Sequence, residues 1–186
     1  MNGILINPGE EFSALKFLQP FTIEAGYLPE LVIKGDEIKP EIGGGLCQIG
    51  TTLFRMAMNS GMEITSRRNH SLVVNYYNDL TNGNPGTDAT IYEPVPDFKF
   101  LNDTNNSVLI QTEMDATNQK LYFTLWGAND GRKAYYSQPV VLRWLKAGEK
   151  KTVETTKLAP GKIQCQHAYI GADAVFTYTR ELADGK

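Results

Sequence analysis

The sequence predicts an α+β fold, in which a mainly antiparallel β-sheet packs with one prominent helix. A run of glycines is followed by apolar residues at three- and four-residue steps, which predicts a helix with Cys47 near its N-terminus. Most of the remaining chain consists of short segments rich in β-branched and aromatic residues, as is typical of strands. A chain of 186 residues is long enough to bury a substantial core.

The N-terminal part of the chain leads into this helix. Residues 1–40 are expected to be irregular, with short strands at 4–6 and 31–33. The apolar face of the helix comprises Leu46, Ile49, Leu53, Met56 and Ala57. Gly61 supplies a stop signal just after the last turn.

The chain after the helix is expected to be β-rich. Segments 108–112 and 120–126 are predicted to pair as a hairpin. Further strands are expected at 63–66, 72–77, 88–92, 98–101, 135–136, 140–145, 151–156 and 174–180. We place a soft boundary at residue 127, so that residues 1–127 carry the candidate site and residues 128–186 form a β-rich extension on the same sheet.

Composition excludes several classes of function. A net charge of -3 gives no electrostatic case for nucleic-acid binding. No apolar run is long enough to span a bilayer, and the N-terminus lacks the pattern of a signal peptide. The two cysteines and two histidines lack the paired spacing of a zinc site, so we expect no metal and no cofactor. We expect a monomer.

Cys47 is the candidate nucleophile. A thiol in the first turn of a helix lies at the positive end of the helix dipole, which favours the thiolate. Gly44 and Gly45 would let a substrate backbone approach closely. The alternative is a packing role, because free cysteine is among the most buried residue types. A disulfide with Cys165 would also remove the nucleophile.

A set of short motifs resembles a known family in order and spacing. The most specific are Gly-Gly-Gly-Leu-Cys-Gln at 43–48 and the later pair His70-Ser71. The other matching segments are 8–13, 26–27, 51–53, 61–64, 88–90 and 97–100. Together they cover about residues 3 to 110 and resemble the VanW domain of bacterial cell-envelope proteins.

The resemblance implies L,D-transpeptidation, which forms 3-3 cross-links between the peptide stems of peptidoglycan. In that activity Cys47 would be the nucleophile, His70 the general base and later the acid, and Asp88 the residue that orients His70. Asp88 is otherwise a turn residue at the start of a strand. The resemblance also implies an extracytoplasmic location, with an export or anchor segment upstream of this chain.

Substrate binding is expected around the same residues. The backbone N–H groups of Cys47 and Gln48 could stabilise an oxyanion. Arg67 or Arg68 could bind a stem carboxylate, and alternation along a strand makes it improbable that both face the site. Ser71 is a weaker candidate in the same segment.

Two other functions remain open at this point. A cysteine peptidoglycan hydrolase, either an amidase or a carboxypeptidase, would use the same Cys47 and His70. A non-catalytic envelope-binding module would use the glycine loop to bind a peptide, with Cys47 merely packed. Better-known L,D-transpeptidases carry the histidine before the cysteine, so their site geometry does not transfer to this chain.

Overall fold

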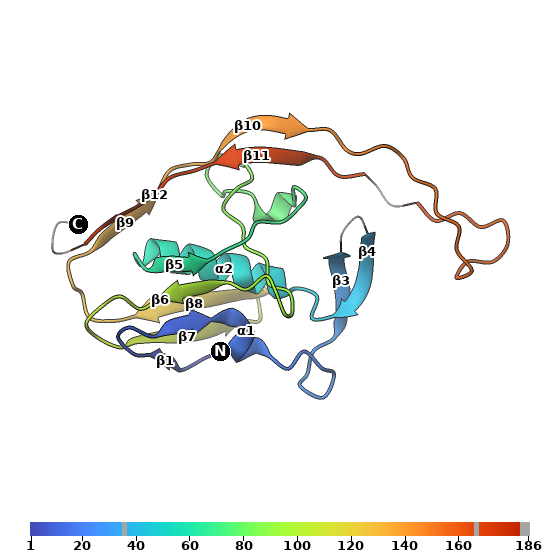
Figure 1. The fold of residues 1–186 in the computed structure, drawn as a ribbon. Helices are drawn as coiled ribbons and strands as arrows, with labels where there is room; N and C mark the ends of the chain where they lie inside the picture. Colours follow the sequence, from blue (N-terminus) through green and yellow to red (C-terminus); the bar gives the residue numbers. More distant parts are fainter. Residues whose placement is uncertain (35–36, 166–167, 183–186) are drawn as a thin grey trace.

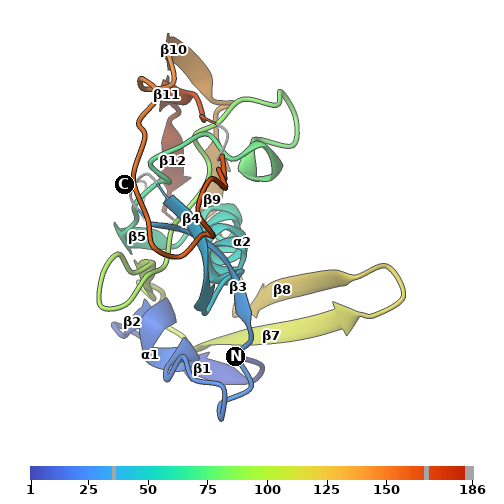
Figure 2. The ribbon, with the colours of Figure 1, turned by 90° about the vertical axis from the view of Figure 1, so that its right-hand side faces the viewer.

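The computed structural model describes residues 1–34, 37–165 and 168–182, and it confirms the α+β class. Two three-stranded antiparallel sheets form the base of the molecule (Figure 1). The sheet β1-β7-β8 comprises Ile4–Ile6, Val108–Asp115 and Lys120–Trp126. The sheet β2-β6-β5 comprises Glu11–Ser13, Lys99–Leu101 and Glu63–Ser66. The predicted hairpin is confirmed as β7–β8, which projects from the body of the molecule (Figure 2).

Helix α2, Leu46–Asn59, packs against these sheets and confirms the predicted helix. It contacts β5, β8 and β9. The buried core that it shares with the sheets includes Leu53, Phe54, Ala57, Met58, Phe12, Phe98, Phe100 and Ile110. Gly50 lies where the helix meets Ile91, and a Cβ at Gly50 would fall 2.8 Å from Ile91 Cγ1. Glycine therefore permits the close approach of residues 89–91 to α2.

A short helix and a hairpin lie near the N-terminal end of α2 (Figure 1). Helix α1, Ala14–Leu18, does not appear among the sequence predictions. Its start is stabilised from far along the chain, because the Asp97 carboxylate accepts hydrogen bonds from Ser13 Oγ at 2.6 Å and Leu15 N at 3.0 Å. The hairpin consists of β3, Pro29–Lys34, and β4, Glu37–Ile42.

The C-terminal strands form two separate ribbons. Strand β9, Lys133–Tyr136, pairs with β12, Tyr178–Glu181, and β10, Val140–Leu145, pairs with β11, Gly171–Val175. These strands pair with one another and not with the sheets before residue 127. The described residues after 127 therefore do not extend the sheets formed before it, contrary to the expectation from the sequence. The ribbons pass over α2 instead, on the side away from the base sheets (Figure 1).

Three further strand predictions are wrong. Residues 72–77 and 88–92 lie in an irregular segment that contains one 3-10 turn, η1, Asn75–Tyr77. Residues 151–156 also form no strand. In the segment around η1, side chains of α2 donate hydrogen bonds to backbone carbonyls that would pair with a neighbouring chain if the segment formed strands.

Within the described ranges, no helix has the length and apolar character needed to cross a membrane.

A charged network fastens the β9–β12 ribbon to the end of α2. Asp103 accepts hydrogen bonds from Arg132 Nη1 at 2.7 Å and from Arg180 Nη2. Both arginines also donate to the carbonyl of Gly61, at 2.9 and 3.0 Å. The side chain of Asp103 is only 16% exposed, so its carboxylate compensates two largely desolvated cations.

Asp103→Asn is expected to lower the free energy of unfolding by about 2 kcal/mol, because it removes the anion that the two arginines share, while Arg132 keeps Asp130 and Arg180 keeps Glu63 as a partner. Glu11→Gln is the matched control, since Glu11 pairs with Lys99 in an exposed ion pair and should cost less than about 1 kcal/mol. Urea denaturation of both variants measures the difference. Equal losses in the two variants would contradict the role given to Asp103.

Candidate functional site

The glycine loop at 43–45 sets the start of α2. Gly45 is the N-cap residue, with a φ of 85° in the left-handed region that favours glycine, and Cys47 is the second residue of the helix. A Cβ at Gly44 would fall 2.2 Å from Glu30 Cβ and 2.8 Å from Glu30 Cα. Strand β3 therefore packs directly on the loop that precedes Cys47.

The backbone amides of the first turn are partly used by the loop itself. Leu46 N donates to Gly43 O at 3.4 Å, and Gln48 N donates to Gly45 O at 3.0 Å. In the described part of the chain, the backbone N–H of Cys47 has no acceptor. It is therefore the first-turn amide that can donate a hydrogen bond to a ligand. The side chain of Gln48 is exposed.

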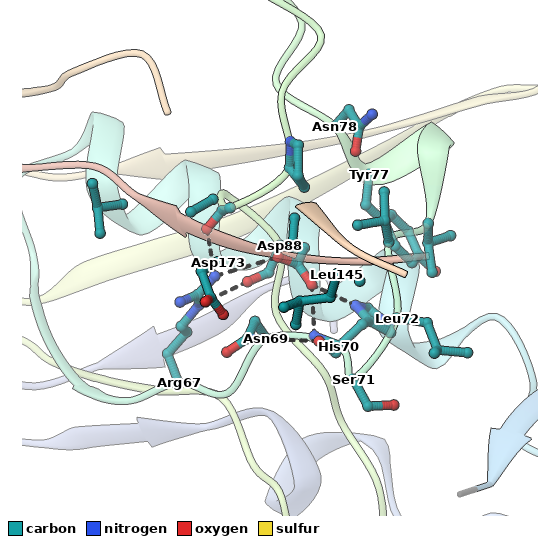
Figure 3. A pocket seen from close by; sticks show the side chains of 18 residues that line it. Arg67, Asn69, His70, Ser71, Leu72, Tyr77, Asn78, Asp88, Leu145 and Asp173 are labelled. Atoms are coloured by element: carbon teal, nitrogen blue, oxygen red, sulfur yellow. Dashed lines mark hydrogen bonds and ion pairs between the residues drawn. The ribbon is translucent and has the colours of Figure 1, made fainter. Parts of the chain in front are cut away.

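His70 and Asp88 form a closely coupled pair. Asp88 Oδ2 lies 2.6 Å from His70 Nδ1 and also accepts the backbone N–H of His70 at 2.7 Å (Figure 3). The side chains are only 7% and 12% exposed, respectively. Cys47 lies within hydrogen-bonding reach of the His70 side chain. Because Nδ1 faces Asp88, Nε2 is the ring nitrogen left for Cys47.

These contacts shift the titration of both groups. Burial alone would lower the pKa of His70, but hydrogen bonds with Asp88 and Cys47 outweigh it and raise that pKa to about 9. Burial alone would raise the pKa of Asp88, and the hydrogen bonds with His70 outweigh it and hold that pKa below its usual value. The pair is therefore an imidazolium beside a carboxylate at neutral pH.

The Cys47 thiol has a second neighbour. Its Sγ lies 3.6 Å from the carbonyl oxygen of Ile91, which can accept the thiol hydrogen. A thiol carries one hydrogen, so donation to Ile91 and transfer to His70 are alternatives. Once that proton is on His70, the sulfur lies beside an imidazolium, which is the kind of neighbour that stabilises a thiolate.

A polar stripe on α2 holds the segment that carries His70 and Asp88. Cys47, Thr51 and Arg55 recur every four residues and share one helix face. Thr51 Oγ1 accepts from Ala89 N and donates to Ala89 O, both at 3.1 Å. Arg55 donates to the carbonyls of Tyr77 at 2.6 Å and Thr87 at 3.1 Å. The helix that presents Cys47 thus also fixes both sides of the irregular segment.

Arg67 and Arg68 face different ways. Arg67 Nε donates to Asp88 O at 2.7 Å, its Nη2 donates to Gly86 O at 2.5 Å, and its guanidinium lies 5.1 Å from the Phe54 ring centroid. Burial lowers the pKa of Arg67, and the charge of Asp88 partly offsets this. The side chain of Arg68 is exposed. Arg67 therefore holds the Asp88 loop in place, and Arg68 is the arginine that faces solvent.

Three residues of the site are absent from the sequence predictions. Tyr77 stacks on His70, with ring centroids 4.7 Å apart and an interplanar angle of 22°. Thr51 and Arg55 bind the irregular segment that carries His70 and Asp88. Their four-residue spacing after Cys47 was the sequence signal that could have placed them on the same helix face as Cys47. No comparable signal pointed to Tyr77, because η1 depends on tertiary contacts. Ser71 is exposed, and together with His70 it lines a pocket on this side of the irregular segment.

The structure offers no second role for the cysteines. Cys47 and Cys165 are both free, and Cys165 is exposed. Within residues 1–34, 37–165 and 168–182, no three histidine, cysteine, aspartate or glutamate side chains are grouped closely enough to bind a metal. His167 lies outside the described residues.

The fold and site together define an α+β protein with a Cys–His–Asp arrangement at the start of a helix. The family model described as VanW like protein matches residues 1–126, and the chain belongs to this family. The match ends where β8 ends.

Two curated proteins are similar to part of the chain. The uncharacterized protein YoaR of Bacillus subtilis is 33% identical over 109 residues, which is 59% of this chain and 34% of that protein. The vancomycin B-type resistance protein VanW of Enterococcus faecalis is 30% identical over 115 residues, which is 62% of this chain and 42% of that protein. The chain thus aligns with less than half the length of each relative. No solved structure matches it significantly.

The His70 titration can be tested by NMR, because the sequence contains only two histidines. We expect one imidazole to titrate near pH 9 and to lose this signal in His70→Gln. Asp88→Asn and Cys47→Ala should each lower the pKa of His70, since both partners raise it. A pKa that stays near 9 in both variants would refute the assigned contacts.

The same shift predicts a pH-dependent stability. A pKa raised from 6.5 to about 9 means that the stabilisation by charged His70 is complete below pH 6.5 and is lost as the pH rises through about 9.

Gly44→Ala is expected to displace β3 from the glycine loop, because the added Cβ would overlap the backbone of Glu30. We expect faster hydrogen exchange in β3 and β4, residues 29–34 and 37–42, and a lower melting temperature. Gly148→Ala is the control, since a Cβ there meets no heavy atom within 4 Å. Unchanged exchange in Gly44→Ala would show that this contact does not hold the hairpin.

Proposed function

We propose that this protein is a cysteine-dependent acyltransferase that acts on the peptide stems of peptidoglycan and forms 3-3 cross-links, as an L,D-transpeptidase does. One observation carries the proposal: Cys47 lies within hydrogen-bonding reach of His70, whose other ring nitrogen is 2.6 Å from Asp88. A nucleophile, a base and a group that orients the base are the parts that acyl transfer through a thioester needs.

In the first half of the proposed reaction, the Cys47 thiolate attacks the carbonyl of the third stem residue. The Cys47 N–H stabilises the oxyanion that develops on that carbonyl. The imidazolium of His70 then donates its proton to the departing amine of D-alanine, and a thioester remains on Cys47. Asp88 keeps Nδ1 of His70 engaged, so that Nε2 is the nitrogen that exchanges the proton.

In the second half, an amine of another stem attacks the thioester and restores the thiolate. Water in place of the amine would give a trimmed stem, so the same site would then act as a carboxypeptidase. Transfer and hydrolysis share the acyl-enzyme and differ only in the acceptor.

We assign the stem-binding surface to residues that border Cys47 and His70. Gly45 has no side chain to block a peptide and no heavy atom close to its open face, whereas the space beside Gly44 is filled by Glu30 of β3. The side chains of Gln48, Arg68 and Ser71 are exposed. Arg68 is the cation that a stem carboxylate would meet, because Arg67 is engaged with Gly86 and Asp88. Such a substrate places the protein outside the cytoplasmic membrane, in the cell envelope.

The proposal predicts a thioester adduct on Cys47. Incubation with disaccharide-tetrapeptide should give a protein mass increased by the acyl group, followed by 3-3 linked dimers. Cys47→Ala should abolish both, and Asp88→Asn should slow transfer by about two to four orders of magnitude. Cys165→Ala is the control and should behave as wild type, since Cys165 is exposed in the C-terminal part.

Each product has a distinct meaning. Trimmed monomer without dimer would replace transfer by hydrolysis. Absence of adduct, product and Cys47 alkylation in the folded protein would refute catalysis and favour a peptide-binding module.

A further inference from the structure

A cavity of about 410 Å³ lies between the irregular segment and the β10–β11 ribbon (Figure 3). His70, Asp88 and Tyr77 line one side, and β11 lines the other. Cys47 is not among the described residues that line it. The cavity therefore meets the Cys–His–Asp site at His70, and its volume suits a small substrate group.

The charged groups of the cavity are not equally engaged. Arg67 is bound to Gly86 and Asp88, and Asp88 is bound to His70. Asp173 of β11 receives two bonds from Arg143, at 2.6 and 3.0 Å, but both go to Oδ2. No donor in the described part of the chain binds its Oδ1, which is therefore available to a ligand. The pair is exposed, with 70% of Arg143 and 46% of Asp173 accessible, so it holds Asp173 only weakly.

Besides Asp173, the cavity wall contains Asn78, whose side-chain oxygen receives no hydrogen bond from the described part of the chain. The carboxamide oxygen of Asn78 is buried and has no hydrogen-bond partner in the described part of the chain. Figure 3 shows it on the side of Tyr77. A buried acceptor without a partner costs free energy, but this oxygen has almost no accessible surface, so Asp173 is the acceptor that a ligand in the cavity can reach. Apolar residues also line the cavity, namely Leu72, Val74, Leu145 and Val175.

We propose that this cavity binds the second substrate of the transfer reaction, with Asp173 recognising a primary ammonium group on an aliphatic chain. The inference rests on the proposed function and adds where the acceptor binds. Acceptor oxygens select a donor, and a carboxylate selects a cationic one. The apolar wall takes the methylene groups that carry the ammonium.

The position of His70 in the wall gives the amine a route to reaction. After the first half-reaction, His70 is neutral, because it has given its proton to the departing D-alanine. The acceptor ammonium then loses one proton to His70 and one to solvent as its nitrogen bonds to the acyl carbon. The carbon–sulfur bond breaks, and the thiolate of Cys47 and the imidazolium of His70 are restored.

Binding can be tested without turnover in Cys47→Ala protein. The probe is Nα-acetyl-lysine amide, and Nα-acetyl-norleucine amide is its counterpart without the ammonium. We expect titration by NMR to show binding of the lysine probe alone, weakened about tenfold or more by a further Asp173→Asn substitution. Equal binding of the two probes, or no effect of Asp173→Asn, would overturn the proposal.

Arg143→Gln is the matched control. It removes the same ion pair as Asp173→Asn but keeps the carboxylate, and Arg143 does not line the cavity. Binding of the lysine probe should therefore be unchanged or tighter. An equal loss in both variants would show that the ion pair only maintains the ribbon, and it would refute recognition by Asp173.

Transfer by the protein with Cys47 intact separates this inference from the proposed function. Asp173→Asn should raise the KM for an acceptor stem about tenfold, with less effect on formation of the acyl adduct in the absence of acceptor. An acyl adduct with an unchanged acceptor KM would refute the acceptor site alone. Lysine-probe binding that depends on Asp173, without any adduct, would refute the proposed function alone.

Discussion

The site depends on how the irregular segment at 67–91 satisfies its backbone hydrogen bonds. Strands would have paired these groups with one another, but here side chains from other elements bind them. Thr51 and Arg55 reach from α2, and Arg67 folds back onto Gly86 and Asp88. Because buried backbone groups need partners, these three side chains hold the segment in place without a sheet.

Asp88 has two roles, because it accepts hydrogen bonds that hold the irregular segment and it is also the partner of His70 in the proposed chemistry. The carboxylate of Asp88 forms hydrogen bonds with the backbone N–H and with the ring Nδ1 of His70. The backbone carbonyl of Asp88 accepts a hydrogen bond from Arg67 Nε. The loop that positions His70 is therefore also the loop that supplies its counter-charge. Tyr77 completes the enclosure by stacking on the imidazole, which excludes water from one face of the ring. Burial without Asp88 would favour neutral histidine, and its carboxylate reverses that preference.

The C-terminal ribbons contribute to the surroundings of the site. The family match ends at residue 126, yet β11 supplies a wall of the cavity beside His70. Phe176, which follows β11, contacts the guanidinium of Arg67. The Asp103 network fastens the base of the ribbons to the end of α2. The two parts of the chain are thus joined at the C-terminal end of α2 and along the cavity beside His70.

The sequence alone determined the elements whose signals are local. The apolar period from Leu46 predicted α2, and two nearby segments rich in β-branched and aromatic residues predicted β7–β8, because each of these signals is local in the sequence. The tertiary structure decided the segment at 67–91, where β-rich composition favoured strands but contacts with α2 prevailed. It also decided that Arg67 holds the loop while Arg68 faces solvent, and that Asp173 and His70 line the same cavity. These outcomes depend on residues about 20 to 100 positions apart, and local patterns carry no information about such contacts.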